Sequence, residues 1–185
     1  MTVGALDDCE FVTGRLQVGL WRAAAQRAGL DLAGVIAELL TDRTTVALPE
    51  SWQGNYTVDR ARAWIEERDA ESPTLLVMEA ASARPVGLVV LAEVPLDDSM
   101  VDVRIGYVIA EALWGRGFAT ELLSGLIDWM RTERSVRTLT GGVDLTNLAS
   151  VRVMENNGFR RISYDEGTAT YRLDIEPGTH PPPDN

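Results

Sequence analysis

The chain of 185 residues contains no lysine, because all 17 of its basic residues are arginine. Without a lysine amine it cannot form a Schiff base with a carbonyl substrate or with pyridoxal phosphate. It also cannot build the phosphate-binding loop of P-loop enzymes or the active site of a protein kinase, each of which places a lysine against nucleotide phosphates. These classes of enzyme are therefore excluded.

Histidine and cysteine occur once each, as His180 and Cys9. Because His180 lies in a proline-rich C-terminal stretch, a Ser-His-Asp triad or a Cys-His pair would need an unfolded tail to supply its base. One cysteine allows no intramolecular disulfide, and together with one histidine it is too few for a structural zinc site. We expect no metal, although this count does not exclude a carboxylate-only magnesium or calcium site.

The catalytic groups that remain are carboxylates, hydroxyls, arginines and backbone amides. They suit a substrate that arrives already activated, so that the protein positions two reactants and handles one proton. Transfer from a thioester to an amine is a reaction of this kind.

Long apolar runs are also missing, since no stretch approaches the roughly 18–20 residues that a membrane span requires. Asp7, Asp8 and Glu10 stand where a secretory signal would carry positive charge and then an apolar run. We therefore expect a soluble cytoplasmic protein with no membrane partner. The net charge of −11 argues against a nucleic-acid partner, which needs clustered basic residues, and is compatible with a cationic substrate.

Hydrophobic periodicity predicts a strand, two helices and three strands, followed by helix, strand, helix and strand. The expected strands cover residues 13–21, 74–80, 86–94, 101–110, 138–144 and 169–175. The expected helices cover residues 31–41, 58–68, 118–131 and 148–157, with a loop over 49–56. This order is typical of an α/β (α+β) fold with a mixed, mostly antiparallel sheet flanked by helices. The strands 101–110 and 138–144 should lie parallel in a βαβ unit.

The pattern contains no internal repeat or linker, so we expect a single domain over 1–176. From residue 177 to residue 185 we expect a disordered tail.

The segment 105–121 runs from a strand through a loop with Gly115 and Gly117 into a strongly amphipathic helix. Glycines allow close approach of the backbone, and the first N–H groups of a helix have no partner within it. Such a helix start can bind a phosphate or pyrophosphate, and Arg116 adds local positive charge. A tight turn explains the same glycines, so this motif alone leaves both interpretations open.

A second motif lies at 147–159. Asn147 is placed as the N-cap of a helix, and Ser150 follows about one turn later, pointing the same way. Gly158 is a natural residue for the helix C-terminus, and Phe159 is expected to pack back over the helix.

Read in order, three segments resemble the GNAT superfamily of acetyltransferases. They are Gly-Tyr-Val-Ile at 106–109, Trp-Gly-Arg-Gly-Phe-Ala-Thr-Glu at 114–121 and Asn-x-x-Ser-x-x-Val-Met-Glu-x-x-Gly-Phe at 147–159. The resemblance covers roughly residues 75–175. Within the superfamily the pattern is most similar to the branch that includes the ribosomal-protein N-terminal alanine acetyltransferases.

This resemblance implies acetyl-CoA as the cosubstrate. The family's phosphate loop, Gln/Arg-x-x-Gly-x-Gly/Ala, falls on residues 114–119, where Trp114 departs from Gln or Arg. The loop amides are implied to hold the pyrophosphate, the backbone of 107–109 to pair with the pantetheine arm, and the start of the second motif to contact the cofactor near its sulfur. The implied contacts are Tyr107, Val108, Ile109, Gly115, Arg116, Gly117, Phe118, Ala119, Thr120, Asn147 and Ser150.

The resemblance also implies the general acid, whereas the base is expected on chemical grounds to be a carboxylate near the centre of the sheet. Many relatives carry a tyrosine where this chain has Met154, so Ser150 is the expected donor to the leaving thiolate. Glu93 and Asp102 are the candidates for the base, which must accept a proton from the amine directly or through water.

Trp52 and Tyr56 fall in the region that shapes the acceptor pocket in such folds. Aromatic residues at these two places could equally belong to the core.

The expected function is therefore N-acetylation of a primary amine, on a protein N-terminus or a small molecule, by direct transfer in a ternary complex. A non-catalytic acyl-CoA-binding regulatory module on the same fold is the alternative. A nucleotide-binding module of another fold would need an acidic residue about 20 positions after the glycines, and Asp144 lies too far along. A homodimer is compatible with the sequence.

Overall fold

The computed structural model describes residues 6–97 and 99–176. Within them, eight strands form one sheet in the order β1-β2-β3-β4-β5-β6-β8-β7. The strands are β1 (Phe11–Val12), β2 (Leu16–Leu20), β3 (Thr74–Glu79), β4 (Arg84–Pro95), β5 (Val101–Ile109), β6 (Val136–Asp144), β7 (Arg160–Asp165) and β8 (Thr168–Asp174). The helices are α1 (Trp21–Arg27), α2 (Leu32–Leu39), α3 (Asp42–Thr45), α4 (Val58–Glu71), α5 (Phe118–Met130) and α6 (Leu148–Asn156), with 3₁₀ turns η1 (Glu50–Trp52) and η2 (Glu111–Leu113).

Neighbouring strands of this sheet are antiparallel except for one pair. Strands β5 and β6 run parallel and are joined through α5, which is the predicted βαβ unit. The mixed, mostly antiparallel sheet flanked by helices is confirmed. The expectation of a single domain over 1–176 stays a prediction, and the predicted tail at 177–185 lies outside the described residues.

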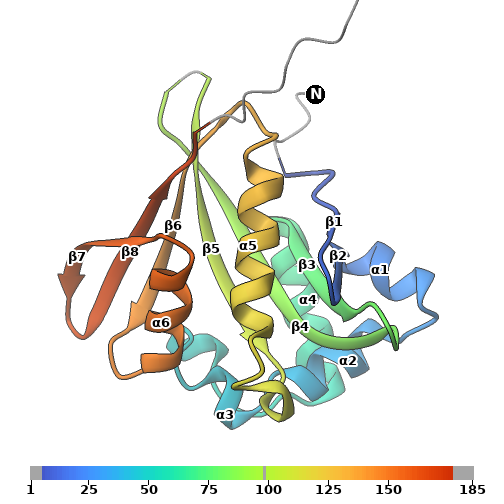
Figure 1. Cartoon of the computed structure of the whole chain (residues 1–185). Helices are drawn as coiled ribbons and strands as arrows, with labels where there is room; N and C mark the ends of the chain where they lie inside the picture. The colour runs from blue at the N-terminus through green and yellow to red at the C-terminus, as the bar shows by residue number, and fades with distance from the viewer. Residues whose placement is uncertain (1–5, 98, 177–185) are drawn as a thin grey trace, which may run out of the picture.

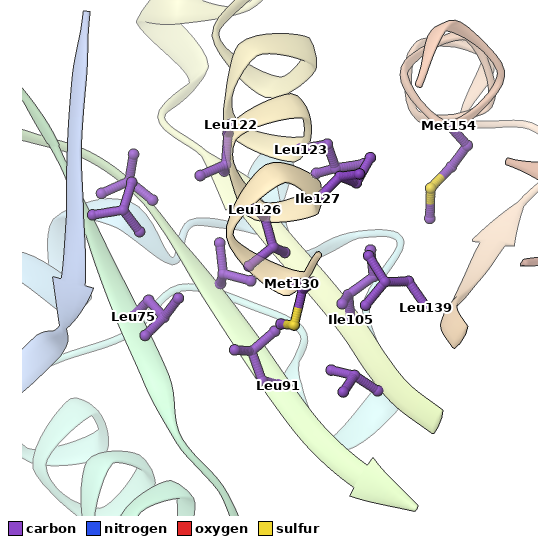
Figure 2. Packing of buried hydrophobic residues seen from close by; sticks show 14 of the residues in the cluster. Leu75, Leu91, Ile105, Leu122, Leu123, Leu126, Ile127, Met130, Leu139 and Met154 are labelled. Carbon is purple, nitrogen blue, oxygen red and sulfur yellow. The ribbon is translucent and has the colours of Figure 1, made fainter. Parts of the chain in front are cut away.

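Helices cover the two faces of the sheet differently (Figure 1). On one face α5 lies across the middle of the sheet with α6 beside it, and on the other face lie α1, α2 and α4. Figure 2 shows Leu122, Leu126 and Met130 directed from α5 toward the strands, and Met154 directed from α6 toward the sheet. All four side chains are at most 2% exposed, so this face holds an aliphatic core.

Local sequence signals set the helix ends. The Asp31 side chain accepts a hydrogen bond from the Gly34 amide at 3.2 Å and caps α2. Thr57 caps α4 in the same way, through the Arg60 amide at 3.2 Å. At the end of α6, Gly158 has a φ of 83°, a backbone conformation that glycine adopts readily, as predicted.

Besides strand β1 and the two 3₁₀ turns, α1, α3 and β7 were not predicted. Helix α1 begins at Trp21, which the sequence pattern assigns to the first strand, and α3 has only four residues. Every residue of β7 is exposed, and the only sequence signal is a short alternation in which Ile162 and Tyr164 stand between polar residues. Among the helices of the described residues, none combines the length and the apolar character needed to cross a membrane.

Candidate active site

The parallel strands β5 and β6 separate halfway along their length. Their register runs from Val101 opposite Val136 to Arg104 opposite Thr140, and among the described residues no pair continues it. Strand β5 nevertheless continues to Ile109, paired with β4 on its other edge. The β6-facing edge of the last β5 residues is therefore free to hydrogen-bond a ligand that lies alongside it.

The start of α5 lies beside this opening. Gly117 is the N-cap residue with a φ of 78°, and it gives the helix no side-chain cap. Gly115 has a φ of 72°, and a Cβ at this position would meet no atom within 4 Å among the described residues. The first amides of α5 are thus available to an anion, at the positive end of the helix dipole.

Trp114, which replaces the family's Gln or Arg, ties this loop to the sheet. Its indole Nε1 donates a hydrogen bond to the Ile109 carbonyl at 2.8 Å, so the loop is fixed to the end of β5. The Arg116 guanidinium lies 5.8 Å from the Phe118 ring centroid, close to the first turn of α5.

Glu121, in the first turn of α5, ties the helix to the hairpin between β1 and β2. Its carboxylate accepts hydrogen bonds from Thr13 Oγ1 at 2.6 Å and from the Arg15 amide and Nε at 2.7 and 2.6 Å. Arg15 Nη1 also donates to the Arg116 carbonyl at 3.0 Å. Burial opposes ionisation of Glu121, but these hydrogen bonds outweigh it and hold its pKa below the ordinary value.

The start of α6 brings a second pair of polar groups to the opening. Asn147 caps the helix, since its Oδ1 accepts from the Ser150 amide at 3.1 Å. The Tyr107 hydroxyl of β5 donates to Ser150 Oγ at 3.3 Å. Met154 is 2% exposed and packs against the sheet, so no side chain at that position offers a proton to the opening.

The end of β5, the start of α5 and the start of α6 line one cavity of about 830 Å³. Of the predicted cofactor contacts, all but Arg116 line it: Tyr107, Val108, Ile109, Gly115, Gly117, Phe118, Ala119, Thr120, Asn147 and Ser150. The cavity therefore joins the uncapped helix start, the free strand edge and the polar start of α6.

Sequence reasoning missed the side of this cavity that α3 forms. Asp42, Arg43 and Thr44 line it, and Arg43 pairs with Glu111 at 2.8 Å. The Arg43 guanidinium also lies 5.8 Å from the centre of the Trp114 ring. A four-residue helix shows no 3.6-residue period, so only the capping box of Thr41 could have indicated it.

The two candidate bases lie away from the cavity. Glu93 of β4 pairs with Val103 of β5, and its side chain accepts a hydrogen bond from the Leu6 amide at 3.1 Å. Asp102 is at the start of β5, where Thr138 and Thr140 donate to its Oδ1 at 2.5 and 2.6 Å. Neither carboxylate is among the groups that line the cavity.

Trp52 and Tyr56 also lie elsewhere, in an aromatic cluster on the opposite face of the sheet. Their rings lie 5.4 and 6.0 Å from the Trp64 ring, edge to face. The Tyr56 hydroxyl donates to the Trp52 carbonyl at 3.1 Å. The structure thus places both residues in the core of that face rather than on the cavity.

The geometry describes a site for an elongated ligand with an anionic end and an arm that can hydrogen-bond like a strand. Coenzyme A has this chemistry, since its pyrophosphate would face the α5 amides and the amide groups of its pantetheine would face the free edge of β5. The open space in front of Gly115 fits a bulky phosphate group.

The sequence matches the model of the acetyltransferase (GNAT) domain over residues 22–160. The chain therefore belongs to the GNAT family of acetyltransferases, as its three motifs predict. No curated protein matches the sequence.

Solved structures share the fold at low sequence identity. A GNAT-family acetyltransferase from Bacillus anthracis has a TM-score of 0.69 and 19% identity, over 90% of this chain and 98% of that one. The ribosomal-protein-S5-alanine acetyltransferase from Vibrio fischeri has a TM-score of 0.64 and 16% identity, over 91% and 98%. The spermidine N-acetyltransferase from Vibrio cholerae, in complex with CoA and spermine, has a TM-score of 0.68 and 16% identity, over 88% and 97%.

Proposed function

We propose that this protein transfers an acetyl group from acetyl-CoA to a primary amine by direct attack in a ternary complex. The observation that carries the proposal is the single cavity that joins the free edge of β5, the uncapped start of α5 and the Asn147–Ser150 pair. In this proposal the amides after Gly115 bind the pyrophosphate, and the backbone of 107–109 aligns the pantetheine arm.

In the reaction, the amine nitrogen attacks the thioester carbonyl carbon, and a C–N bond forms. The C–S bond then breaks with its electron pair going to sulfur. Ser150 donates its hydroxyl proton to that sulfur, and the proton lost by the amine restores Ser150 through water. An acyl-cysteine intermediate is not needed, and Cys9 is unsuited to one because burial raises its pKa to about 12.

The cavity lining carries two carboxylates that can attract a cationic acceptor, beside the guanidinium groups of Arg43 and Arg152. Asp42 and Asp144 both face the cavity, and they can attract an ammonium group before it loses its proton. Hydrogen bonds from the Thr146 hydroxyl and amide hold the Asp144 pKa below its ordinary value, so that this carboxylate stays charged in mildly acidic solution. We therefore expect small amines or a peptide N-terminus as acceptors, and we leave Glu93 and Asp102 outside the mechanism.

The test is thiol release from acetyl-CoA with a panel of acceptors: spermine, an aminoglycoside and a peptide with a free N-terminus. Ser150→Ala is expected to lower kcat about 10- to 100-fold while CoA binding persists. Ser163→Ala, on the exposed strand β7, is the matched control and should retain wild-type kcat.

Three outcomes separate the possible functions. Turnover with intersecting double-reciprocal plots supports direct transfer in a ternary complex. Binding of CoA without turnover on any amine would favour the non-catalytic acyl-CoA-binding module. If CoA does not bind, both the acetyltransferase and the acyl-CoA-binding module are excluded.

A further inference from the structure

Ser150 accepts a hydrogen bond from the hydroxyl group of Tyr107. Tyr107 lies near the end of β5 and Ser150 in the first turn of α6, 43 positions apart in sequence. Their hydroxyls nevertheless meet at 3.3 Å on the cavity wall. This distance is long for a hydroxyl pair, but hydrogen bonds at catalytic sites are often long before the ligand binds and then tighten.

Tyr107 is held by contacts on the sheet side as well as by Ser150. Its ring packs partly buried against the aliphatic core beneath α5, and its backbone pairs with Val89 of β4. Burial raises the pKa of the Tyr107 hydroxyl, against a smaller lowering by the Ser150 hydrogen bond. The hydroxyl therefore keeps its proton, and it can donate that proton's hydrogen bond to Ser150 across the working pH range.

Ser150 is held by two further constraints. Its amide is bonded to Asn147 Oδ1, and its place in the first turn of α6 fixes where its Cβ points. A serine hydroxyl has one hydrogen to donate and two lone pairs that accept. When Tyr107 occupies one lone pair, the Ser150 hydrogen is left free to point elsewhere in the cavity.

We propose that Tyr107 is a positioning residue, whose hydroxyl turns the Ser150 hydrogen toward the sulfur of bound coenzyme A and polarises it. The inference rests on the proposed function. When the C–S bond breaks, the electron pair moves to sulfur and the Ser150 proton follows. Tyr107 stabilises the oxygen that gives this proton and itself stays protonated. Hydrogen bonds in a chain polarise one another, so this pair stabilises a thiolate better than Ser150 alone.

Four charged side chains line the cavity. They are Asp42 and Arg43 on α3, Asp144 at the end of β6 and Arg152 on α6. Desulfo-CoA differs from CoA by the missing thiol, so the ratio of the two affinities cancels the contribution that these charged groups make to both ligands. An alkyl thiol such as that of cysteine titrates near about 8.5, so a change in this ratio between pH 7 and pH 9.5 reports on the thiol of the ligand.

The test compares CoA with desulfo-CoA by calorimetry over this pH range, so that no amine acceptor is needed. In the wild type, the ratio of CoA to desulfo-CoA affinity is expected to rise with pH, because the protein favours the thiolate. Tyr107→Phe should lower that ratio at pH 9.5 about five- to tenfold, which is the effect of one hydrogen bond to a charged site. Ser150→Ala should lower it at least as much, and the double variant no further than Ser150→Ala.

Steady-state kinetics give a second measurement. Tyr107→Phe should lower kcat about tenfold while the KM for acetyl-CoA stays within twofold, because only the leaving thiolate uses this hydrogen bond. Tyr171→Phe, which removes a tyrosine hydroxyl from the same core, is the control and should match the wild type in both assays.

The possible failures are distinguishable. A wild-type affinity ratio in Tyr107→Phe, additive effects in the double variant, or a ratio in the wild type that does not depend on pH would overturn this inference alone. If the ratios of CoA to desulfo-CoA affinity are as expected but no amine is acetylated, only the proposed acetyl transfer is contradicted. If neither CoA nor desulfo-CoA binds, both proposals fail.

Discussion

The two faces of the sheet are built from different side chains. Beneath α5 and α6 the core is mainly aliphatic, with Leu122, Leu126 and Met130 completely or almost completely buried. Beneath α1, α2 and α4 it is centred on Trp64, whose ring makes edge-to-face contacts with three other aromatic rings. The cavity is lined by the starts of α5 and α6, the end of β5 and α3, whereas Trp52 and Tyr56 pack in the aromatic cluster.

This difference indicates a division of roles. A regular aliphatic layer holds α5 straight on the sheet, so that the start of the helix stands at a fixed place beside β5. Three helices of 7, 8 and 14 residues must be packed on the opposite face, and large aromatic rings fill the spaces between them. Trp52 and Tyr56 belong to this aromatic packing, and their role at the acceptor pocket stays a prediction.

The largest effect is expected from breaking the aromatic layer. Trp64 is 4% exposed, and its Nε1 has no hydrogen-bond partner among the described residues, so its contribution comes from packing. Trp64→Ala should lower the free energy of unfolding by about 3–5 kcal/mol in urea titrations. CoA affinity, measured where the variant is folded, should stay within threefold of wild type. A loss of affinity comparable to the loss of stability would place the aromatic face in the site after all.

A second variant tests the anion site at the start of α5, the helix that packs on the aliphatic face. Gly115→Glu puts a carboxylate where the pyrophosphate is proposed to bind, and CoA affinity should fall at least 100-fold, or about 2.7 kcal/mol, by calorimetry. Gly167→Glu is the matched control, because Gly167 also has a positive φ, of 90°, and open space around its Cβ, in the turn before β8. Equal losses of affinity in both variants would show that backbone strain, and not the anion site, is responsible.

The smallest effect is expected from removing the hydrogen bonds between Glu121 of α5 and the β1–β2 hairpin. The Glu121 pKa lies below its ordinary 4.5, so the stabilisation is complete above that pH and disappears as pH falls through the lowered value. Glu121→Gln should lower the free energy of unfolding at pH 7 by under about 1 kcal/mol. The gap from wild type should close below pH 4.5 in urea titrations. Glu155→Gln, at an exposed position of α6, is the control, and a gap as large at pH 3 as at pH 7 would contradict the assignment.

Much of the fold and the cofactor side of the site could be predicted from sequence, because both depend on local signals. Periodicity located α5 within one residue, and the glycines before it predicted the helix start that the structure shows at Gly117. The four-residue helix α3 and the Tyr107–Ser150 contact carry no periodic signal, and the alternation in the exposed strand β7 is too short to be distinctive. Glu93 and Asp102 were proposed as the base because of their positions on predicted strands. Which end of a strand faces the cavity depends on where β5 and β6 separate.

That separation also affects how the sheet holds together. Nine residue pairs join β4 to β5, but only four join β5 to β6. The strands β6, β8 and β7 are thus attached to the rest of the sheet by a short seam, with α5 and α6 packed across it. A ligand that lies along the free edge of β5 takes the place of a missing strand, so the acetyl donor would act as a structural part of the sheet for as long as it stays bound.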